Sequence, residues 1–151
     1  MSDSTHIDFC VKSRTLNVQH ITQLLQVAPT SGFGPNERYI GKAKHGDAIV
    51  NVERIRPSFG VWHLSTEGEI GSNSVEDHAR LLIDRLRPAK DGIENLLQDA
   101  AYEVILSLWC VGLRGFDVSS NTLSQLASIS KYVSVRFFEA EEISTSAVNA
   151  S

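Results

Sequence analysis

The sequence predicts an α+β domain in which helices cover one face of an antiparallel sheet of about five strands. Three observations support this fold class. Several short segments alternate between apolar and polar residues, as half-buried strands do. Other segments repeat apolar residues every three or four positions, as amphipathic helices do. A strand followed by a similar helix also occurs twice, over 16–24 and 116–126. We therefore expect a ferredoxin-like or pseudo-duplicated strand-helix-strand arrangement.

The first half of the chain predicts three strands and one helix. Residues 6–12 alternate and form the first strand. Asn17 is placed to cap a helix that Pro29 ends. The stretch 31–47 is rich in glycine and shows no period, which predicts a long loop. Residues 48–55 and 61–66 then predict an antiparallel pair of strands.

The second half predicts two helices, a strand, a third helix and a last strand. Ser74 is placed to cap a helix that Pro88 ends, and a shorter helix follows over 91–101. Residues 102–111 and 132–138 alternate as strands, and Asp117 or Ser119 can cap the helix between them. We expect one domain over 1–138 and a flexible tail over 139–151.

Composition excludes several classes of protein. The chain has 151 residues, of which 42% are hydrophobic and 21% charged, as in ordinary globular domains. Its net charge of -4 gives no global positive field for nucleic acid. No apolar run is long enough to span a bilayer, and the first residues lack the pattern of a secretion signal. We therefore expect a cytoplasmic protein with neither a nucleic-acid nor a membrane partner.

Motif searches predict no catalytic residue, metal site or cofactor. The stretch 41–46 resembles a phosphate loop but lacks the required Lys-Ser or Lys-Thr pair. The histidines lack metal-ligand spacing, and no serine lies in Gly-x-Ser-x-Gly. Cys10 and Cys110 are expected to be ordinary apolar residues that do not bond to each other. A weak anion site remains an alternative, from basic residues around the glycine-rich loop: Arg38, Lys42, Lys44, Arg54 and Arg56.

Strand alternation predicts which side chains face away from the helices. Trp62 should lie in the core, whereas Trp109 should lie on the open face with histidine, arginine and hydroxyl residues. This mixture is typical of binding surfaces. A second copy of the chain could cover this face, which would make a homodimer. The predicted binding residues are His63, Ser65, Trp109, Tyr132, Arg136, Arg54 and Arg56.

The order of several short motifs resembles a bacterial family known as domain of unknown function 4279. Its members carry a helix of the type Ile21-Thr-Gln-Leu-Leu25 followed by Ala28-Pro-Thr30. The resemblance continues through Gly60-Val-Trp-His-Leu-Ser65 and Gly115-Phe-Asp-Val-Ser119. It implies no activity, cofactor or catalytic residue. Small stand-alone proteins of this kind are compatible with immunity or inhibitor roles.

We therefore expect a non-enzymatic module that binds a protein or small ligand through the open sheet face and the neighbouring loop. The alternative is a small hydrolase or transferase that uses His63 with a carboxylate such as Asp8 or Glu103. Geometry separates the two, because general base action needs a carboxylate or hydroxyl within about 4 Å of a His63 ring nitrogen.

Overall fold

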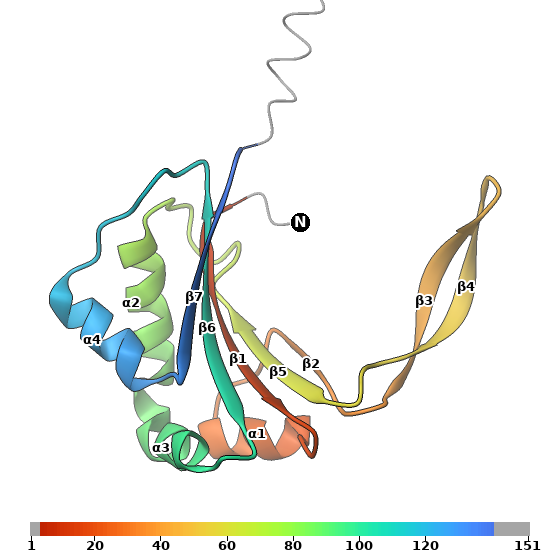
Figure 1. The fold of residues 1–151 in the computed structure, drawn as a ribbon, viewed down its shortest axis with the longest axis horizontal. Coiled ribbons are helices and arrows are strands. Elements are labelled where there is room, and N and C mark those ends of the chain that lie inside the picture. Colours follow the sequence, from red (N-terminus) through yellow and green to blue (C-terminus); the bar gives the residue numbers. More distant parts are fainter. Residues whose placement is uncertain (1–3, 141–151) are drawn as a thin grey trace, which may run out of the picture.

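The computed structural model describes residues 4–140, which form one body and one projecting hairpin (Figure 1). The chain is α+β, as the sequence predicts. The elements, in order, are β1 (His6–Ser13), α1 (Val18–Leu25), β2 (Ser31–Phe33), β3 (Arg38–His45), β4 (Ala48–Ile55), β5 (Gly60–Ser65), α2 (Val75–Leu86), the 3-10 turn η1 (Arg87–Ala89), α3 (Lys90–Gln98), β6 (Glu103–Val111), α4 (Ser120–Ser128) and β7 (Tyr132–Phe138).

The main sheet has five strands in the order β2-β5-β1-β6-β7. The pairs β2–β5, β5–β1 and β1–β6 are antiparallel, whereas the pair β6–β7 is parallel. The expected purely antiparallel sheet is therefore wrong at this pair. The chain leaves β6 and crosses through α4 before it enters β7, and such a crossover joins parallel strands. The ferredoxin-like or duplicated arrangement stays a prediction.

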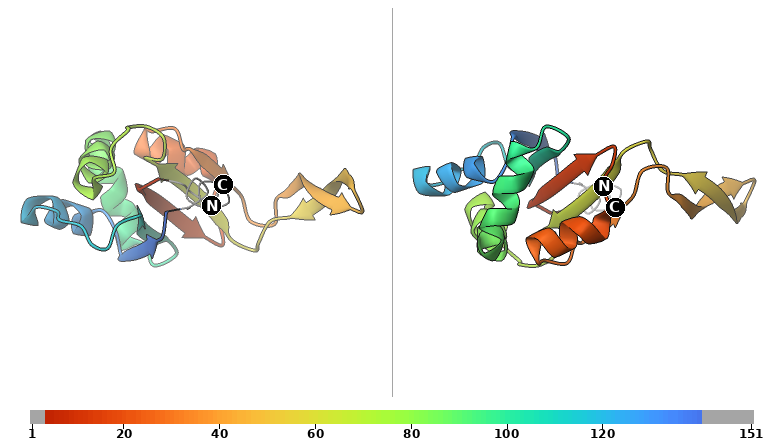
Figure 2. Two further views of the ribbon diagram at one scale, coloured as in Figure 1. Left: turned by 90° about the horizontal axis from the view of Figure 1, so that it is seen from above. Right: turned by 90° about the horizontal axis from the view of Figure 1, so that it is seen from below.

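The helices cover one face of this sheet and leave the other face open (Figures 1 and 2). Alternate residues of β1, Ile7, Phe9 and Val11, are completely buried beneath them. Trp62 is also completely buried, as predicted, and its ring meets that of Phe9 edge to face at 6.1 Å. Trp62 Nε1 donates to Thr22 Oγ1 of α1 at 3.0 Å, so the core fixes this helix against β5.

Side-chain caps begin three of the helices where the sequence predicts them. Asn17 accepts from the backbone N–H of His20, Ser74 from Asp77 and Ser119 from Thr122. Close backbone packing then brings α3 against α1 at Gly92. A Cβ at that position would lie 2.5 Å from the carbonyl oxygen of Leu24, so no larger residue fits without a shift.

The prediction of a loop over 31–47 is wrong. This stretch contains β2, which pairs with β5, and β3, which pairs with β4. The expected pair of 48–55 with 61–66 is therefore also wrong. Every residue of β3 is at least partly exposed to solvent, so neither face of this strand requires a row of apolar residues. A turn at Gly46, whose φ is 63°, joins β3 to β4.

We call residues 38–55, which are β3, the turn and β4, the arm. The arm forms its own two-stranded sheet and projects from the body (Figures 1 and 2). None of its residues is buried. At its base, Asn36 N–H donates to the Pro57 carbonyl at 2.7 Å, and Arg56 N–H donates to the Glu37 carbonyl at 2.8 Å. The arm thus leaves and rejoins the body at one point.

Two other predictions concern the ends of the chain and the cysteines. Most of the predicted tail over 139–151 lies outside the described residues. Cys10 and Cys110 are unbonded, as expected, because Cys110 lies in the core whereas Cys10 lies on the opposite side of the sheet.

Candidate functional site

The open face of the five-stranded sheet collects most of the polar side chains predicted for binding. Its residues come from the strand positions between the core residues. Registers place Ser65, Asp8 and Ser107 in one row across β5, β1 and β6, and Ser134 of β7 continues it. His63 and Cys10 are paired in the next row, where Ser31 of β2 pairs with His63 on the other side.

Asp8 lies at the centre of this face between two histidines. His6 Nε2 is 3.5 Å from Asp8 Oδ1, and His63 Nε2 is 3.3 Å from Asp8 Oδ2. The Asp8 side chain is only 12% exposed, whereas that of His63 is 24% exposed. The three residues make a charge cluster that is partly shielded from water, where electrostatic interactions are stronger than on an open surface.

This cluster shifts the pKa values of two members in opposite directions. Burial alone raises the pKa of Asp8, but hydrogen bonds with His6, His63 and Ser65 outweigh it and hold that pKa well below its usual range. Burial alone lowers the pKa of His6, but its interactions with Asp8 and the Ser4 carbonyl raise it overall. Asp8 is therefore a carboxylate at neutral pH, and His6 binds its proton more tightly than an ordinary histidine does.

His63 connects this carboxylate to a hydroxyl on the edge of the sheet. Its Nδ1 lies 3.0 Å from Ser31 Oγ, while its Nε2 faces Asp8. An ionised carboxylate only accepts, so in the tautomer that carries its proton on Nε2 the ring donates to Asp8 and accepts from Ser31 at Nδ1. The expected acid–base partner of His63 is thus Asp8. Glu103 is at the opposite end of the face, where it pairs with Lys12.

Trp109 lies at the other end of the open face in an aromatic stack. It pairs in register with His6 on one side and with Arg136 on the other. The rings of His6 and Phe138 lie parallel to its ring, at 5.8 and 5.3 Å between centroids. The Arg136 guanidinium is 5.1 Å from the same ring. Trp109 therefore lies outside the core, but neighbouring side chains on the open face partly cover its ring.

Arg54 and Arg56, which were predicted to join the binding surface, occupy different places. Arg54 lies in the arm, and its side chain covers Gly41 so closely that a Cβ there would lie 2.9 Å from Arg54 Cδ. Arg56 lies at the base of the arm, where its guanidinium is 3.8 Å from the Tyr39 ring and 4.7 Å from the Phe33 ring. These are cation–π distances.

The structure thus gathers some of the predicted binding residues and separates others. His63 and Ser65 meet at Asp8, and Trp109 meets Arg136. Tyr132 lies at the exposed edge strand, and Arg54 lies in the arm. Ser31 and His6 were missed. The signal for His6 was its strand phase, shared with Asp8, whereas Ser31 was hidden by the prediction of a loop.

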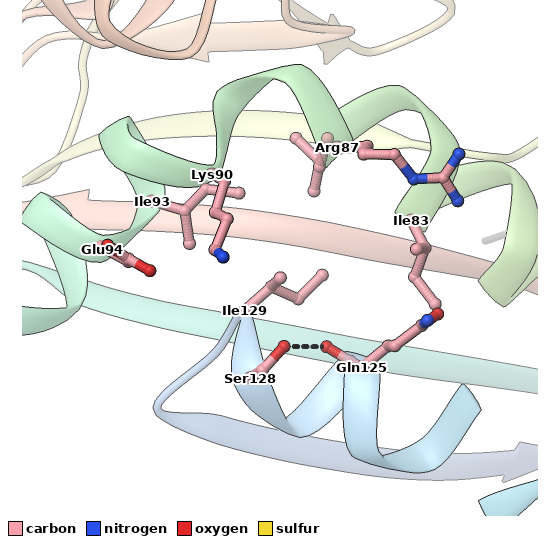
Figure 3. A pocket seen from close by; sticks show the side chains of 9 residues that line it. Ile83, Arg87, Lys90, Ile93, Glu94, Gln125, Ser128 and Ile129 are labelled. Atoms are coloured by element: carbon pink, nitrogen blue, oxygen red, sulfur yellow. Dashed lines mark hydrogen bonds between the residues drawn. The ribbon is translucent and has the colours of Figure 1, made fainter. Parts of the chain in front are cut away.

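A separate groove of about 360 Å³ lies among the helices on the covered side (Figure 3). Leu86 and three isoleucines from α2, α3 and the end of α4 form its apolar part, and its charged groups are Arg87, Lys90 and Glu94. The Ser128 hydroxyl donates to the carbonyl of Gln125 in its own helix at 2.7 Å. The groove offers apolar area and positive charge, whereas the histidine–carboxylate cluster is on the open face.

Within residues 4–140, no three His, Cys, Asp or Glu side chains are arranged to hold a metal ion. None of the helices described there has both the length and the apolar character to cross a membrane.

The family model described as "Domain of unknown function (DUF4279)" matches residues 3–136, a range that contains the arm, α1 to α4 and the sheet except for the end of β7. Neither the curated proteins nor the solved structures gave a match.

Proposed function

The chain belongs to the DUF4279 family, whose description names no activity, and we propose from the structure that it is a protein-binding module whose arm holds an acidic partner. The observation that carries the proposal is the arm itself. It is the one part of the described chain, residues 4–140, that forms a sheet without any core beneath it.

A free arm of this kind has little to stabilise it. An isolated two-stranded hairpin is at best marginally stable in water and needs a third strand or a packing surface. The arm strands pair only with each other, and all their residues are at least partly exposed. A partner that packs on the arm would supply the missing surface.

One face of the arm carries the apolar groups that such a partner would cover. Strand alternation and the register of β3 with β4 place Ile40, Ile49 and Ile55 on the same face. They are 66%, 72% and 62% exposed, respectively. Large branched side chains so open to water are unusual as a group and are typical of contact surfaces. We call this the isoleucine face.

Charge selects the kind of partner. Arg38, Lys42 and Lys44 lie on the isoleucine face, where Glu53 is the acidic residue. The arm therefore carries an excess of positive charge in a chain whose net charge is -4. A protein surface with apolar contacts ringed by Asp and Glu complements it, and long-range attraction would speed the encounter.

The open sheet face is the second surface in this proposal. The arm leaves the body on the side of the sheet away from the helices (Figure 1). The open face on that side carries Trp109, Tyr132 and Arg136 on β6 and β7. Tyrosine, tryptophan and arginine are the residues that most often anchor interfaces. An immunity or inhibitor role, in which the module covers an acidic surface of another protein, is compatible with this proposal.

The experiment compares two single substitutions that differ only in the face of the arm they alter. Ile49→Asp places a negative charge on the isoleucine face, whereas Val50→Asp places one on the opposite face of the same strand, where Val50 is also exposed. A third variant replaces residues 38–55 with an Asn-Gly turn between Glu37 and Arg56, which are already hydrogen-bonded. Tagged proteins are used to capture partners from an extract of the source cells, at low and high salt.

The proposal expects one acidic protein to be captured by the wild type and by Val50→Asp, and to be lost from Ile49→Asp and from the arm deletion. Its capture should weaken as salt rises. The same capture by all four proteins would overturn the role of the arm. Size measurements detect the third outcome, in which the chain binds a second copy of itself through the isoleucine face. Self-association that Ile49→Asp abolishes would overturn the proposal of an acidic partner.

A further inference from the structure

We propose that Ser31 is the nucleophile of an acyl-transfer site on the open face, with His63 as its general base and Asp8 as the residue that positions His63. The site is separate from the isoleucine face of the arm. It rests on two contacts in series, 3.0 Å from Ser31 Oγ to His63 Nδ1 and 3.3 Å from His63 Nε2 to Asp8 Oδ2. This is the order hydroxyl, imidazole, carboxylate that activates a serine.

The sheet itself holds the three groups in place. They come from three adjacent strands, β2, β5 and β1, and Ser31 and His63 are directly paired in register. Groups on paired strands have little freedom to separate, which suits a site that needs fixed geometry. Solvent exposure decreases from the hydroxyl to the imidazole to the carboxylate. Ser31 on the edge strand is exposed, His63 is partly covered, and Asp8 is the least accessible.

The neighbouring nucleophiles are less suitable than Ser31. Cys10 lies opposite His63 in β1, but burial and the nearby Asp8 raise its pKa to about 11, so it is a neutral thiol at physiological pH. The Ser65 hydroxyl accepts from the backbone N–H of Glu67 at 3.1 Å and also interacts with Asp8. Ser31 is the hydroxyl that contacts the nitrogen of His63 able to take a proton.

A cation beside Ser31 indicates the class of substrate. Ser31 and Phe33 share the open side of β2, because Gly32 between them faces Val18 of α1. Arg56 lies over the Phe33 ring, about 7 Å along the strand from Ser31 by strand geometry. Within residues 4–140, no carboxylate lies within ion-pair distance of Arg56. The site therefore suits an ester that carries a carboxylate or phosphate a few atoms from its carbonyl.

The reaction uses only the ester and water. Ser31 Oγ bonds to the carbonyl carbon while its proton passes to His63 Nδ1. The carbon–oxygen bond to the alcohol then breaks, and the alcohol takes that proton from Nδ1. Water next attacks the acyl-serine and gives its proton to the same nitrogen, which returns it to Ser31 Oγ as the acid leaves. Asp8 accepts from His63 Nε2–H throughout and stabilises the transient imidazolium.

The experiment uses two probes on the full chain. Diisopropyl fluorophosphate should label Ser31, identified by the mass of its peptide. The 4-nitrophenyl monoester of succinic acid should be hydrolysed faster than 4-nitrophenyl acetate. Ser31→Ala should abolish labelling, and His63→Asn should slow both reactions about 100-fold, the usual contribution of a general base. Arg56→Ala should raise KM for the succinate ester alone.

The controls separate chemistry from folding. Ser130→Ala removes a hydroxyl away from the site, which donates to the carbonyl of Leu126 at 2.9 Å, and should leave labelling unchanged. The pH dependence of wild-type labelling should vanish in His63→Asn. Asp8→Asn should slow labelling and change its pH profile, with melting curves to show that it is folded. Labelling of the wild type no faster than of Ser31→Ala or His63→Asn would overturn the proposal.

Discussion

Trp62 of the body and Ile49 of the arm both lie in β-strands, yet Trp62 is 0% exposed and Ile49 is 72% exposed. In the body, helices cover one face of the sheet and bury its apolar side chains, as is usual for such sheets. The arm buries neither face and exposes three isoleucines on one of them. We infer that the buried core of the body supplies the free energy of folding, and that the exposed isoleucines of the arm add little to it in the isolated chain.

Trp62→Ala is expected to have the largest effect. It would leave a cavity beside Phe9 and remove the hydrogen bond to Thr22, so the free energy of unfolding should fall by about 3 to 5 kcal/mol. Chemical denaturation measures it. A loss below about 1 kcal/mol, the range of surface substitutions, would mean that Trp62 is not a core residue.

Asp8→Asn is expected to have an intermediate effect that depends on pH. The substitution removes a carboxylate that two histidines contact, and should lower the free energy of unfolding by about 1 to 3 kcal/mol at neutral pH. Because the folded pKa of Asp8 lies below its ordinary value of 3.8, its contribution is present above that pH and is lost as pH falls through the folded value.

His6 gives the opposite pH dependence. Its folded pKa lies above its ordinary value of 6.5, so its contribution is fully present below pH 6.5 and is lost as pH rises through the folded value. Melting of the wild type at a series of pH values should therefore show losses on both sides, and both should be smaller in Asp8→Asn. Parallel curves for the two proteins would show that the cluster does not contribute to stability.

Trp109→Ala should cost less than Trp62→Ala, although both remove an indole. Trp109 stacks between His6 and Phe138 outside the core, so roughly 1 to 2 kcal/mol is expected from lost ring contacts and area. Melting beside a size measurement checks this. If the monomeric variant is as unstable as Trp62→Ala, the open face is a second core rather than a binding surface.

Ile49→Ser in the arm should have the smallest effect on stability. The side chain is already exposed, so the free energy of unfolding should change by less than about 0.5 kcal/mol. A matched Leu106→Ser substitution in β6, where the side chain is fully buried, should be severely destabilising. A large loss for Ile49→Ser would show that the arm packs on the body in solution.

The division between body and arm also explains which predictions the sequence could support. Burial gives a segment a periodic sequence pattern. The capped helices of the body and its strands other than β2 were therefore predicted, together with the core position of Trp62. The arm is not buried and carries no such period, so β3 was mistaken for a loop. Because β3 was missed, β4 was assigned to β5 instead of to the strand that directly precedes it.

The candidate site was predictable only in part for the same reason. Strand phase placed Asp8 and His63 on one face, and their contact followed from the register of β1 with β5. Ser31 could not be connected to His63, because β2 is a short edge strand of three residues whose pairing depends on β5. The hydroxyl of the proposed nucleophile was thus hidden by the same error that hid the arm.

Amide hydrogen exchange of the isolated, monomeric protein tests the central claim most directly. The account predicts that amides of residues 38–55 exchange within the time of the first measurements, because nothing but the other arm strand covers them. Amides of β1, β5 and β6 should exchange only through global unfolding, since these strands lie within the five-stranded sheet. Arm amides as protected as those of β1 would contradict the account, because an arm that is stable alone needs no partner.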